Sequence, residues 1–421
     1  MTDPERALPQ AVLRAATDRR LLDETIRRGR TTRAELAAVT GYSRPTVSEA
    51  VRRMVAQGLL DTSGLQETGR RGRVGTFYSL GACAGWVLAL EISQAGVRAR
   101  ATDLAGAVLH EDTNLPTLPG EVAELVTSVR SLVHRVAGSS GTTLTTAPSP
   151  SEVSTSPPLL SGPTAPPPMA TPTPSPGPSL STVGGPDGFA VGRGPLRAIG
   201  VSVANPVNPG TQAVVPLAGT PFPEGLLSPE HMLGDLTNAP VLVDNDVNLA
   251  ALAEHRLGRA AGESSFAYVY LGAGMGVGLY LNGRLIRGAH GLAGEIGYLP
   301  GIVSPTLSGD LRAGGFDRKD APSVNIDAVL ALLDQPSAPA VRQLAEALSR
   351  AITSVAAVVD PALFLLGGPV GTHPALLREV RELTTFPGAA RIEHGALGPD
   401  APLTGAVQLA LEHARATATA A

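Results

Sequence analysis

The chain of 421 residues has a formal net charge of −4 and a single cysteine, Cys83. One cysteine excludes a disulfide framework and a cysteine-rich zinc site. A chain of this length is expected to form two or three domains. No apolar run reaches the roughly 18 residues that span a bilayer, and the N-terminus lacks a signal-peptide pattern. We therefore expect a cytoplasmic protein without a membrane partner.

Charge is unevenly distributed along the chain. Residues 1–80 hold 14 Arg, no Lys and 9 acidic residues, a net charge of +5, whereas the remainder carries −9. A basic segment on an acidic body favours contact between the first segment and a polyanion. Charge alone leaves a solvated pair of charged helices as the alternative.

Three helices are predicted in the basic segment. Apolar residues at helical spacing predict the first over 11–28. The second lies in TTRAELAAVTG, with Thr31 or Thr32 as its cap and Gly41 at its end. The third follows at once in YSRPTVSEAVRRMVAQGLL, and two helices joined by a tight glycine-containing turn form a helix-turn-helix.

The third helix is the predicted recognition helix. Ser43 is a good N-cap, and Pro45 is typical of the first turn. The predicted buried stripe consists of Val47, Val51, Met54 and Val55. The predicted DNA-binding residues at the start of this helix and on its outward face are Ser43, Arg44, Thr46, Ser48 and Arg52.

Two short strands, LLDTSG and TFYSL, enclose the glycine-rich tip GRRGRVG. This pattern predicts a winged helix, in which the third helix reads the major groove. Arg70, Arg71 and Arg73 at the tip are expected to reach phosphate or the minor groove. We therefore predict a winged helix-turn-helix domain over 1–80 that binds double-stranded DNA; a small helical interaction domain is the alternative.

From Trp86 onward the pattern indicates an α/β body. WVLALEISQAGVRARATDLAGAVLH predicts two strands, the second ending in a turn at 103–106, and a helix is predicted over 121–138. Beyond residue 194 strands and helices alternate until a helix that ends near Arg415.

Residues 139–194 are rich in Ser, Thr, Pro and Gly. The 12 prolines in 148–178 exclude helix and sheet there. We predict a disordered insertion that loops out of a domain; a linker between two domains is the alternative.

Three motifs of the body resemble those of the ROK family of repressors and sugar kinases. VDNDVNLAALAEHRLG resembles its sugar-site motif, LGAGMGVGLYLNGRLIRGAHGLAGEIG its second phosphate loop and signature, and VVDPALFLLGGPVG its adenosine-side motif. The resemblance implies an actin-like (ribonuclease H-like) two-lobed body over 84–421. Lobe 1 would span about 84–243 and lobe 2 about 244–400, and a C-terminal helix over 401–415 would pack back on lobe 1. A winged helix before such a body resembles the family's repressors of sugar genes, including those of xylose and N-acetylglucosamine metabolism.

The ATP side departs from the family's kinases. Where they carry Asp-x-Gly-Gly-Thr-Lys, this chain has EISQAG, so Glu91 replaces the aspartate and Gly96 stands for the lysine. In the glycine-rich loop, 271–283, Ala273 replaces the usual threonine. Phosphoryl transfer depends on positioning and neutralising phosphate oxygens. We therefore expect no kinase activity, no catalytic residue and no cofactor, and the glycine loop would serve as a strand–turn–strand element of the fold.

The sugar side matches the family more closely. Asn245 and Asp246 match the pair that contacts sugar hydroxyls, and Glu295 matches the sugar-binding glutamate. Carboxylate and carboxamide groups together supply the acceptors and donors that a polyol needs. Tyr298, where the family has histidine, completes the predicted ligand site. The alternative is that Asp244 and Asp246 cap the following helix and Glu295 caps a turn.

Residues 302–325 contain no cysteine, which excludes the family's structural zinc, and no metal is predicted. The resemblance implies a transcriptional regulator, a repressor whose operator affinity is set by a small carbohydrate effector. We expect a homodimer or a dimer of dimers, since specificity generally takes two half-sites. The alternatives are an active ATP-dependent carbohydrate kinase and a ligand-independent DNA-binding protein with a vestigial pocket.

Overall fold

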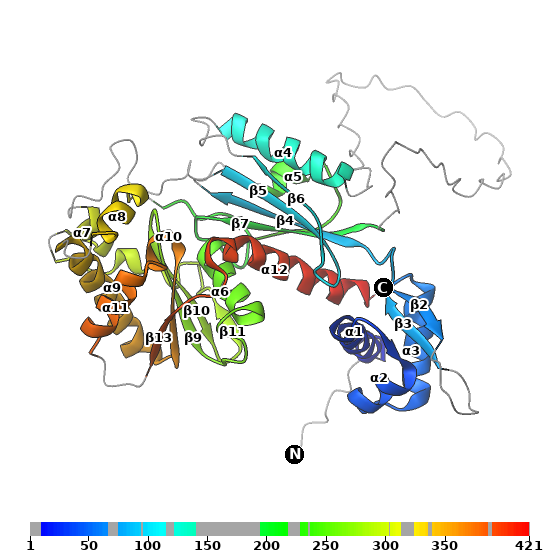
Figure 1. Ribbon diagram of the computed structural model, residues 1–421. Helices are drawn as coiled ribbons and strands as arrows, with labels where there is room; N and C mark the ends of the chain where they lie inside the picture. Colours follow the sequence, from blue (N-terminus) through cyan, green and yellow to red (C-terminus); the bar gives the residue numbers. More distant parts are fainter. Residues whose placement is uncertain are drawn as a thin grey trace, which may run out of the picture.

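The computed structural model describes residues 10–65, 75–93, 96–114, 122–139, 194–217, 228–234, 236–302, 304–312, 324–335, 339–385 and 390–420. Figure 1 shows a small domain at the N-terminal end and two larger lobes, each built on its own sheet. Among these residues no helix is long and apolar enough to cross a membrane. Apart from its two end positions, the predicted insertion lies outside the described residues.

The N-terminal domain is a winged helix. Its elements are α1 Gln10–Arg28, β1 Thr31–Thr32, α2 Arg33–Thr40, α3 Arg44–Ala56, β2 Leu60–Leu65 and β3 Thr76–Leu80, and its antiparallel sheet has the order β1-β3-β2. Of the two predicted caps of α2, Thr32 is the N-cap, and it forms a capping box with Glu35. Gly41 follows α2 with a φ of 74°, which glycine adopts without steric cost and which turns the chain toward α3.

The buried face of α3 completes the core of this domain. Val47, Ala50, Val51 and Met54 are fully buried in one hydrophobic cluster with residues of α1 and α2. The prediction that Val55 belongs to this face is wrong, because its side chain is 37% exposed. One residue beyond Met54 is a rotation of about 100° around the helix, which carries Val55 away from the core.

Lobe 1 contains β4 Trp86–Ser93, β5 Gly96–Asp103, β6 Val108–Asn114, α4 Val122–Ser139, β7 Leu196–Val203, α5 Pro229–Leu233 and β8 Val241–Asn245. Its sheet has the order β6-β5-β4-β7-β8, in which β4, β5 and β6 pair antiparallel and β7 and β8 follow in parallel. The apolar strand β4 lies at the centre and is buried along nearly its whole length. The edge strand β6 was not predicted, because VLHEDTN holds only two apolar residues.

Lobe 2 contains the strands β9 Phe266–Leu271, β10 Met275–Leu281, β11 Arg284–Ile286, β12 Leu363–Gly367 and β13 Arg391–His394. Its helices are η1 Ile296–Tyr298, α7 Leu307–Leu311, α8 Ile326–Leu333, α9 Pro339–Val359, α10 Gly368–Gly371 and α11 Pro374–Leu383. The sheet order β11-β10-β9-β12-β13 repeats that of lobe 1, with three antiparallel strands followed by two parallel ones. Two lobes of the same topology form the predicted actin-like fold.

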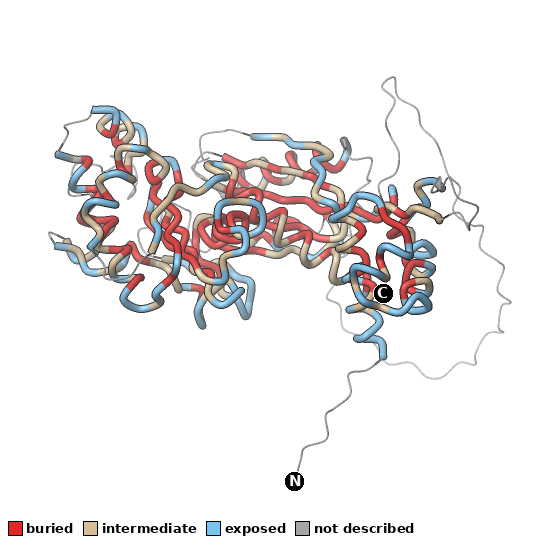
Figure 2. The backbone as a smooth tube through the Cα atoms, turned by 60° about the horizontal axis from the view of Figure 1, so that its bottom comes forward, coloured by how far each residue is buried: buried red, intermediate tan, exposed pale blue. Residues whose placement is uncertain are grey.

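Two helices lie where the lobes meet. α6 Asp246–Leu257 follows β8, and α12 Ala401–Ala418 packs against α6 and against β4 and β7 of lobe 1. The last helix therefore extends beyond its predicted end at residue 415. Figure 1 shows α12 running from the region between the lobes to the winged helix. In Figure 2 the buried backbone is concentrated in the strands of both lobes and in the region between them.

Candidate functional site

The recognition helix α3 presents a polar face to solvent. Its exposed residues include Arg44, Thr46, Glu49 and Arg52, and Ser48 is partly exposed. The Ser43 hydroxyl oxygen caps the helix and accepts the N–H of Thr46 at 3.3 Å. Arg52 Nη2 lies 3.2 Å from Glu49 Oε1, but these side chains are 73% and 59% exposed. A pair so exposed is weak, so Arg52 is able to turn toward a phosphate or a base edge instead.

A bidentate ion pair fixes α3 on α1. Arg53 Nη2 and Nε donate to the two carboxylate oxygens of Asp18 at 2.7 and 3.1 Å. Asp18 is only 5% exposed. Bidentate Arg–carboxylate pairs define orientation as well as energy. This pair therefore sets the rotation of α3 about its axis and directs Arg52 outward.

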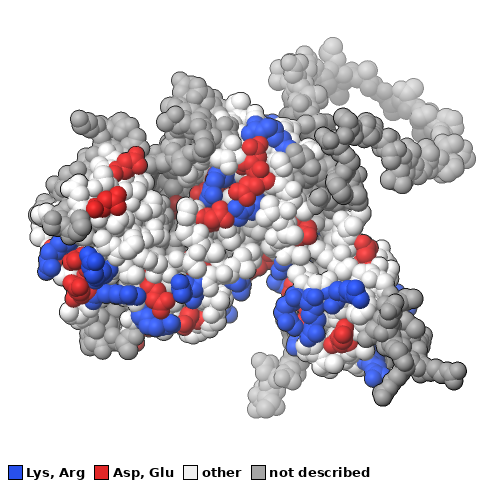
Figure 3. Space-filling view, in the orientation of Figure 1, with Lys and Arg blue, Asp and Glu red and all other residues white. Residues whose placement is uncertain are grey.

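Figure 3 shows basic side chains gathered on the winged helix. The exposed arginines of the domain, among the described residues, are Arg14, Arg19, Arg20, Arg27, Arg28, Arg30, Arg33, Arg44 and Arg52. The predicted wing arginines Arg70, Arg71 and Arg73 lie outside the described residues.

The second candidate site is formed where α6 begins, between the lobes. Asn245 is the N-cap of α6, and its Oδ1 accepts the N–H groups of Val247 and Asn248 at 3.0 and 3.2 Å. Asp246 Oδ1 accepts the N–H of Val247 at 2.8 Å. The side-chain cap is thus Asn245 and not Asp244, which corrects the capping alternative in part.

Glu295 lies at the start of η1 but does not cap it, since its side chain makes no capping hydrogen bond. Burial raises the pKa of Glu295 to about 7. Burial is the largest cause that raises the pKa of Asp246 to about 7, and the charges of Glu91 and Glu295 contribute to that value. Glu91 of β4 and Glu295 before η1 therefore each lie within electrostatic reach of Asp246. The predicted ligand residue Tyr298 is 52% exposed.

Arg287, which sequence analysis did not find, holds this site together through Asp244. Arg287, after β11 of lobe 2, donates through Nε to Asp244 Oδ2 at 2.7 Å. Asp244 is 2% exposed, and its Oδ1 accepts the N–H of Asn245 at 2.8 Å. The pair thus links lobe 2 to the end of β8 directly before the Asn-Asp motif. Nothing in the sequence spacing relates Arg287 to Asp244, because their contact depends on the closure of the two lobes.

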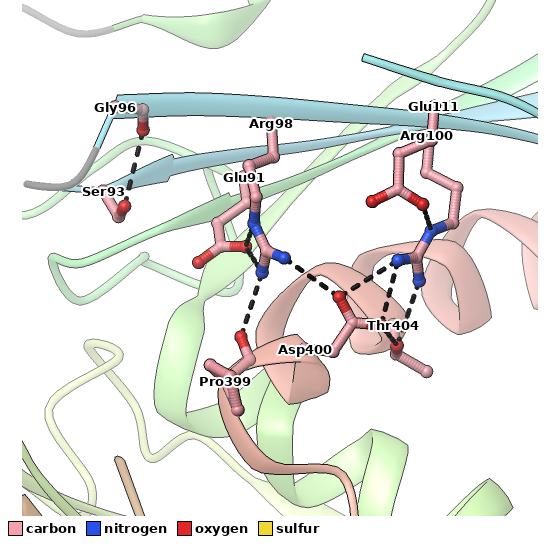
Figure 4. Close-up of polar contacts among 9 residues, drawn as sticks. All are labelled: Glu91, Ser93, Gly96, Arg98, Arg100, Glu111, Pro399, Asp400 and Thr404. Atoms are coloured by element: carbon pink, nitrogen blue, oxygen red, sulfur yellow. Dashed lines mark hydrogen bonds and ion pairs between the residues drawn. The ribbon is translucent and has the colours of Figure 1, made fainter. Parts of the chain in front are cut away.

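The first hairpin, where the family's kinases hold ATP phosphates, contains an internal ion-pair network (Figure 4). Glu91 is 8% exposed, and Arg98 Nε donates to its Oε2 at 2.9 Å. The same guanidinium donates to Asp400 Oδ1 and to the Pro399 carbonyl, both at 2.9 Å. Arg100 Nη2 lies 2.9 Å from Asp400 Oδ2. Glu91, which stands where the family's kinases have aspartate, is therefore paired with a cation of the protein itself, the Arg98 guanidinium.

The glycine-rich loop is a β-hairpin, in which β9 and β10 pair from Leu271 and Met275 onward. Packing restricts Gly272 and Gly278 among its alternating glycines, whereas a Cβ on Gly274 would meet no atom within 4 Å. A Cβ on Gly278 would lie 2.7 Å from the Val247 carbonyl oxygen of α6, and one on Gly272 would lie 2.5 Å from the Tyr270 hydroxyl oxygen. Both distances are shorter than van der Waals contact allows. The backbone of α6 thus requires glycine at position 278, and the Tyr270 side chain crowds position 272.

Tyr270 fills the space between two loops that the resemblance assigns to the nucleotide. Its ring also lies 2.8 Å from the position that a Cβ on Gly368 would occupy, at the end of β12. Burial, together with the charge of Asp246, raises the pKa of this hydroxyl, which places it near the inter-lobe carboxylates. Sequence analysis missed Tyr270, because an aromatic residue in an apolar strand looks like ordinary core.

In the segment where the family's zinc loop is missing, a carboxylate organises the backbone. Asp310 is 6% exposed, and it accepts the N–H groups of Ile302 and Ser304 at 2.5 and 2.8 Å and Arg350 Nη2 at 3.3 Å. Among the described residues, no group of three or more His, Cys, Asp or Glu side chains is arranged to hold a metal ion.

Replacing Asp310 with alanine is expected to lower the free energy of unfolding by about 2–3 kcal/mol, because two backbone donors and a guanidinium lose their acceptor. Urea unfolding measures this loss. The matched control is Asp334→Ala, since Asp334 is 77% exposed and pairs with His373 at 3.3 Å; its effect should stay within about 0.5 kcal/mol. Equal effects of the two changes would show that Asp310 does not organise the loop.

Comparison with known proteins agrees with this division of the chain. Residues 193–306 match the ROK family, and residues 15–72 match the MarR family. The bifunctional enzyme NanE/NanK of Brucella melitensis is 32% identical over 216 residues, which are 48% of this chain and 40% of that protein. The chain thus spans about two fifths of the length of this relative.

Two solved structures resemble the whole chain or its body. A ROK family transcriptional regulator, described as a homologue of the E. coli MLC protein, covers 97% of this chain and 99% of its own, with a TM-score of 0.65 and 16% identity. A ROK family glucokinase from Streptomyces griseus, in complex with glucose and AMPPNP, covers 78% and 100%, with a TM-score of 0.53 and 18% identity. At such identities the likeness establishes the fold. The chain thus contains a segment that matches the ROK family, residues 193–306, and before it a segment that matches the MarR family, residues 15–72.

Proposed function

We propose that this protein is a DNA-binding transcriptional regulator, a repressor of carbohydrate-related genes. In this proposal residues 1–80 bind the operator and residues 84–421 form a kinase-like body without catalytic activity. The observation that carries the proposal is the winged helix, whose recognition helix α3 directs Arg44 and Arg52 into solvent while Arg53 is held by Asp18. Selection of binding duplexes from a random pool by the full-length protein tests it. Failure to enrich any sequence would contradict the proposal.

The ATP side of the body supports a regulator rather than a kinase. Arg98 engages Glu91, and Tyr270 packs against Gly272 and Gly368. Phosphates entering this region would have to displace a buried ion pair and an aromatic ring. That displacement would consume binding energy that a kinase uses to position the γ-phosphate.

A carbohydrate kinase is the second candidate, and Asp246 favours it. A pKa of about 7 is that of an efficient general base at neutral pH. The relative NanE/NanK is described as an enzyme, although this chain covers only 40% of it. Release of ADP in a coupled assay over a panel of hexoses distinguishes the two candidates. Turnover that Asp246→Asn abolishes would establish the kinase.

The proposed effector is a small carbohydrate bound by Asn245, Asp246, Glu295 and Tyr298. Of the four, Asp246 and Glu295 support the proposal, since among the described residues neither carboxylate has an ion pair with a basic side chain, and both are costly to bury. A ligand specific to the folded state must raise its stability. A thermal-shift screen of sugars and sugar phosphates therefore tests the site, and a hit that persists in Asp246→Ala and Glu295→Ala would place the ligand elsewhere.

The wing is expected to contribute phosphate contacts. Replacing Arg70 and Arg71 with alanine should weaken binding to all duplexes. It should also reduce the slope of log affinity against log salt by roughly two, because binding releases about one counterion fewer for each phosphate contact that is lost. Fluorescence anisotropy over a salt series measures the slope. A slope equal to that of the wild type would exclude the wing from the interface.

We also propose a homodimer or a dimer of dimers, joined mainly through the ROK body. One winged helix covers a short half-site, and two related by a two-fold axis read an operator with useful specificity. Sedimentation should therefore give at least a dimer at micromolar concentration. A monomer, both with and without the selected duplex, would contradict the assembly.

A further inference from the structure

The helix α12 connects the two candidate sites of the protein. It has 18 residues, a length of about 27 Å at 1.5 Å per residue. Figure 1 shows its first turn between the lobes and its last turn beside α1 of the winged helix. Both ends are held by specific contacts, and so is the middle.

At the site end, Asp400 directly precedes α12 and receives two guanidinium groups from β5 (Figure 4). Arg98 Nη1 donates to Asp400 Oδ1 at 2.9 Å, and Arg100 Nη2 does so at 3.0 Å. Arg98 also holds Glu91, whose charge raises the pKa of Asp246. Glu91, Arg98 and Asp400 thus form a chain of ion pairs from β4 to the start of α12, and α12 also packs along α6, which begins at Asp246.

At the DNA-binding end, α12 enters the core of the winged helix. Ala414 and Ala418 belong to the same hydrophobic cluster as Leu21 and Leu22 of α1. All four side chains are at most 3% exposed. The cluster passes from the winged helix to the body without interruption, so a shift of the last turns of α12 must displace α1 or open the core.

The middle of α12 packs closely against α6 and β7. A Cβ on Gly405 would lie 2.0 Å from the Leu249 carbonyl oxygen of α6, and one on Gly200 of β7 would lie 2.1 Å from the Ala406 carbonyl oxygen. The helix backbone thus touches the backbone of α6 and of β7. A helix seated in this way moves as one body rather than by bending.

We propose that α12 transmits the state of the inter-lobe site to the winged helix, with Asp400 as the positioning residue at the site end and Ala414 and Ala418 as the contact at the other. The inference rests on the proposed function, since it names the route by which an effector would change DNA binding. Closure of the lobes around a ligand pulls on Arg98 and Asp400, and α12 carries the displacement to α1.

Hydrogen exchange of the full-length protein tests the route without an effector. In Asp400→Asn, we expect exchange to rise about threefold to thirtyfold in residues 410–418 of α12 and in residues 18–28 of α1, the range that coupling energies between sites usually cover. The matched control is Glu111→Gln, which removes the other carboxylate partner of Arg100, at 2.8 Å, and leaves the contacts of Arg100 with Asp400 and Thr404 of α12 in place. Exchange at both distant segments should stay at the wild-type rate in this control.

A second variant tests the same ion pair by changing its partner on β5. Arg98→Met removes the guanidinium between Glu91 and Asp400 and should reproduce the distant effect, even where Asp400→Asn fails to fold. Faster exchange confined to residues 91–98 and 401–405 in either variant would overturn the proposal. The affinity of wild-type protein for the selected duplex is measured separately, so loss of the proposed function and loss of the transmission route give different results.

Discussion

Replacing Arg44 and Arg52 with alanine is expected to lower the affinity of the full-length protein for its selected duplex by roughly 100-fold or more. Arginine contacts to base edges discriminate by about 1–3 kcal/mol each. Both arginines are exposed on α3, and the surface pair of Arg52 with Glu49 at 3.2 Å opposes a turn toward DNA only weakly. Binding to a random-sequence duplex should fall less, so the ratio of the two affinities decreases. Anisotropy titrations at one salt concentration measure both.

The matched control for this loss is a pair of exposed arginines in lobe 2. Arg342 of α9 and Arg378 of α11 are exposed, so Arg342→Ala with Arg378→Ala removes the same charge at a distance from the winged helix. That variant should bind the selected duplex within about twofold of the wild type, which separates base contact from the general electrostatic term. Equal losses in both double variants would assign the effect to net charge and remove α3 from the recognition surface.

The winged helix was predictable because its signals are local. Thr32, Ser43 and Gly41 act within one helical turn of their own positions, and the structure uses all three as predicted. Caps and turns depend on short-range hydrogen bonds and backbone conformation. The error at Val55 arose at the edge of the buried stripe, where packing against neighbouring helices decides exposure and the periodicity of the sequence does not.

The motifs of the inter-lobe site were recognisable in the sequence, but the residues that pack against the site and hold it in place were not. Asn245, Asp246 and Glu295 could be proposed because their motifs are contiguous, and their role in ligand binding stays a prediction. Arg287 and Tyr270 were missed, although one bridges the lobes at 2.7 Å and the other fills the space beside Gly368. Such contacts join residues that the chain separates widely, and single-sequence patterns carry no information about them.

The role of the glycine-rich loop illustrates the same limit. Its sequence indicates a phosphate cradle as readily as a hairpin, since both need glycine where a backbone approaches another atom closely. The structure shows what approaches Gly278, namely the backbone of α6 at Val247. The resemblance to the ROK family, with Ala273 in place of threonine, favours the hairpin interpretation independently of the contact between Gly278 and Val247.

Asp246→Asn is expected to stabilise the protein by about 2 kcal/mol at pH 8 and to change its stability little at pH 4. The pKa of Asp246 is about 7 in the folded protein and has a reference value of 3.8. Below pH 4 the carboxyl is protonated in both states, and its burial has no ionisation cost. Between pH 4 and pH 7 the unfolded chain ionises while the folded protein keeps the proton, so stability falls, and above pH 7 the full cost is present.

Asparagine keeps the oxygen that accepts the Val247 N–H and has no charge, so the variant escapes this cost. Three pKa units correspond to about 4 kcal/mol, part of which is shared with Glu295 through their mutual repulsion. Urea unfolding at the two pH values measures the gain. The control is Asp112→Asn, because Arg135 at 2.7 Å lowers the pKa of Asp112 and removal of that carboxylate should destabilise slightly at pH 8. A gain at pH 8 would indicate that the Asp246 carboxylate is retained for a ligand rather than for stability. A loss of stability at pH 8 would instead make Asp246 a structural cap of α6. The proposed effector would then lack its main contact.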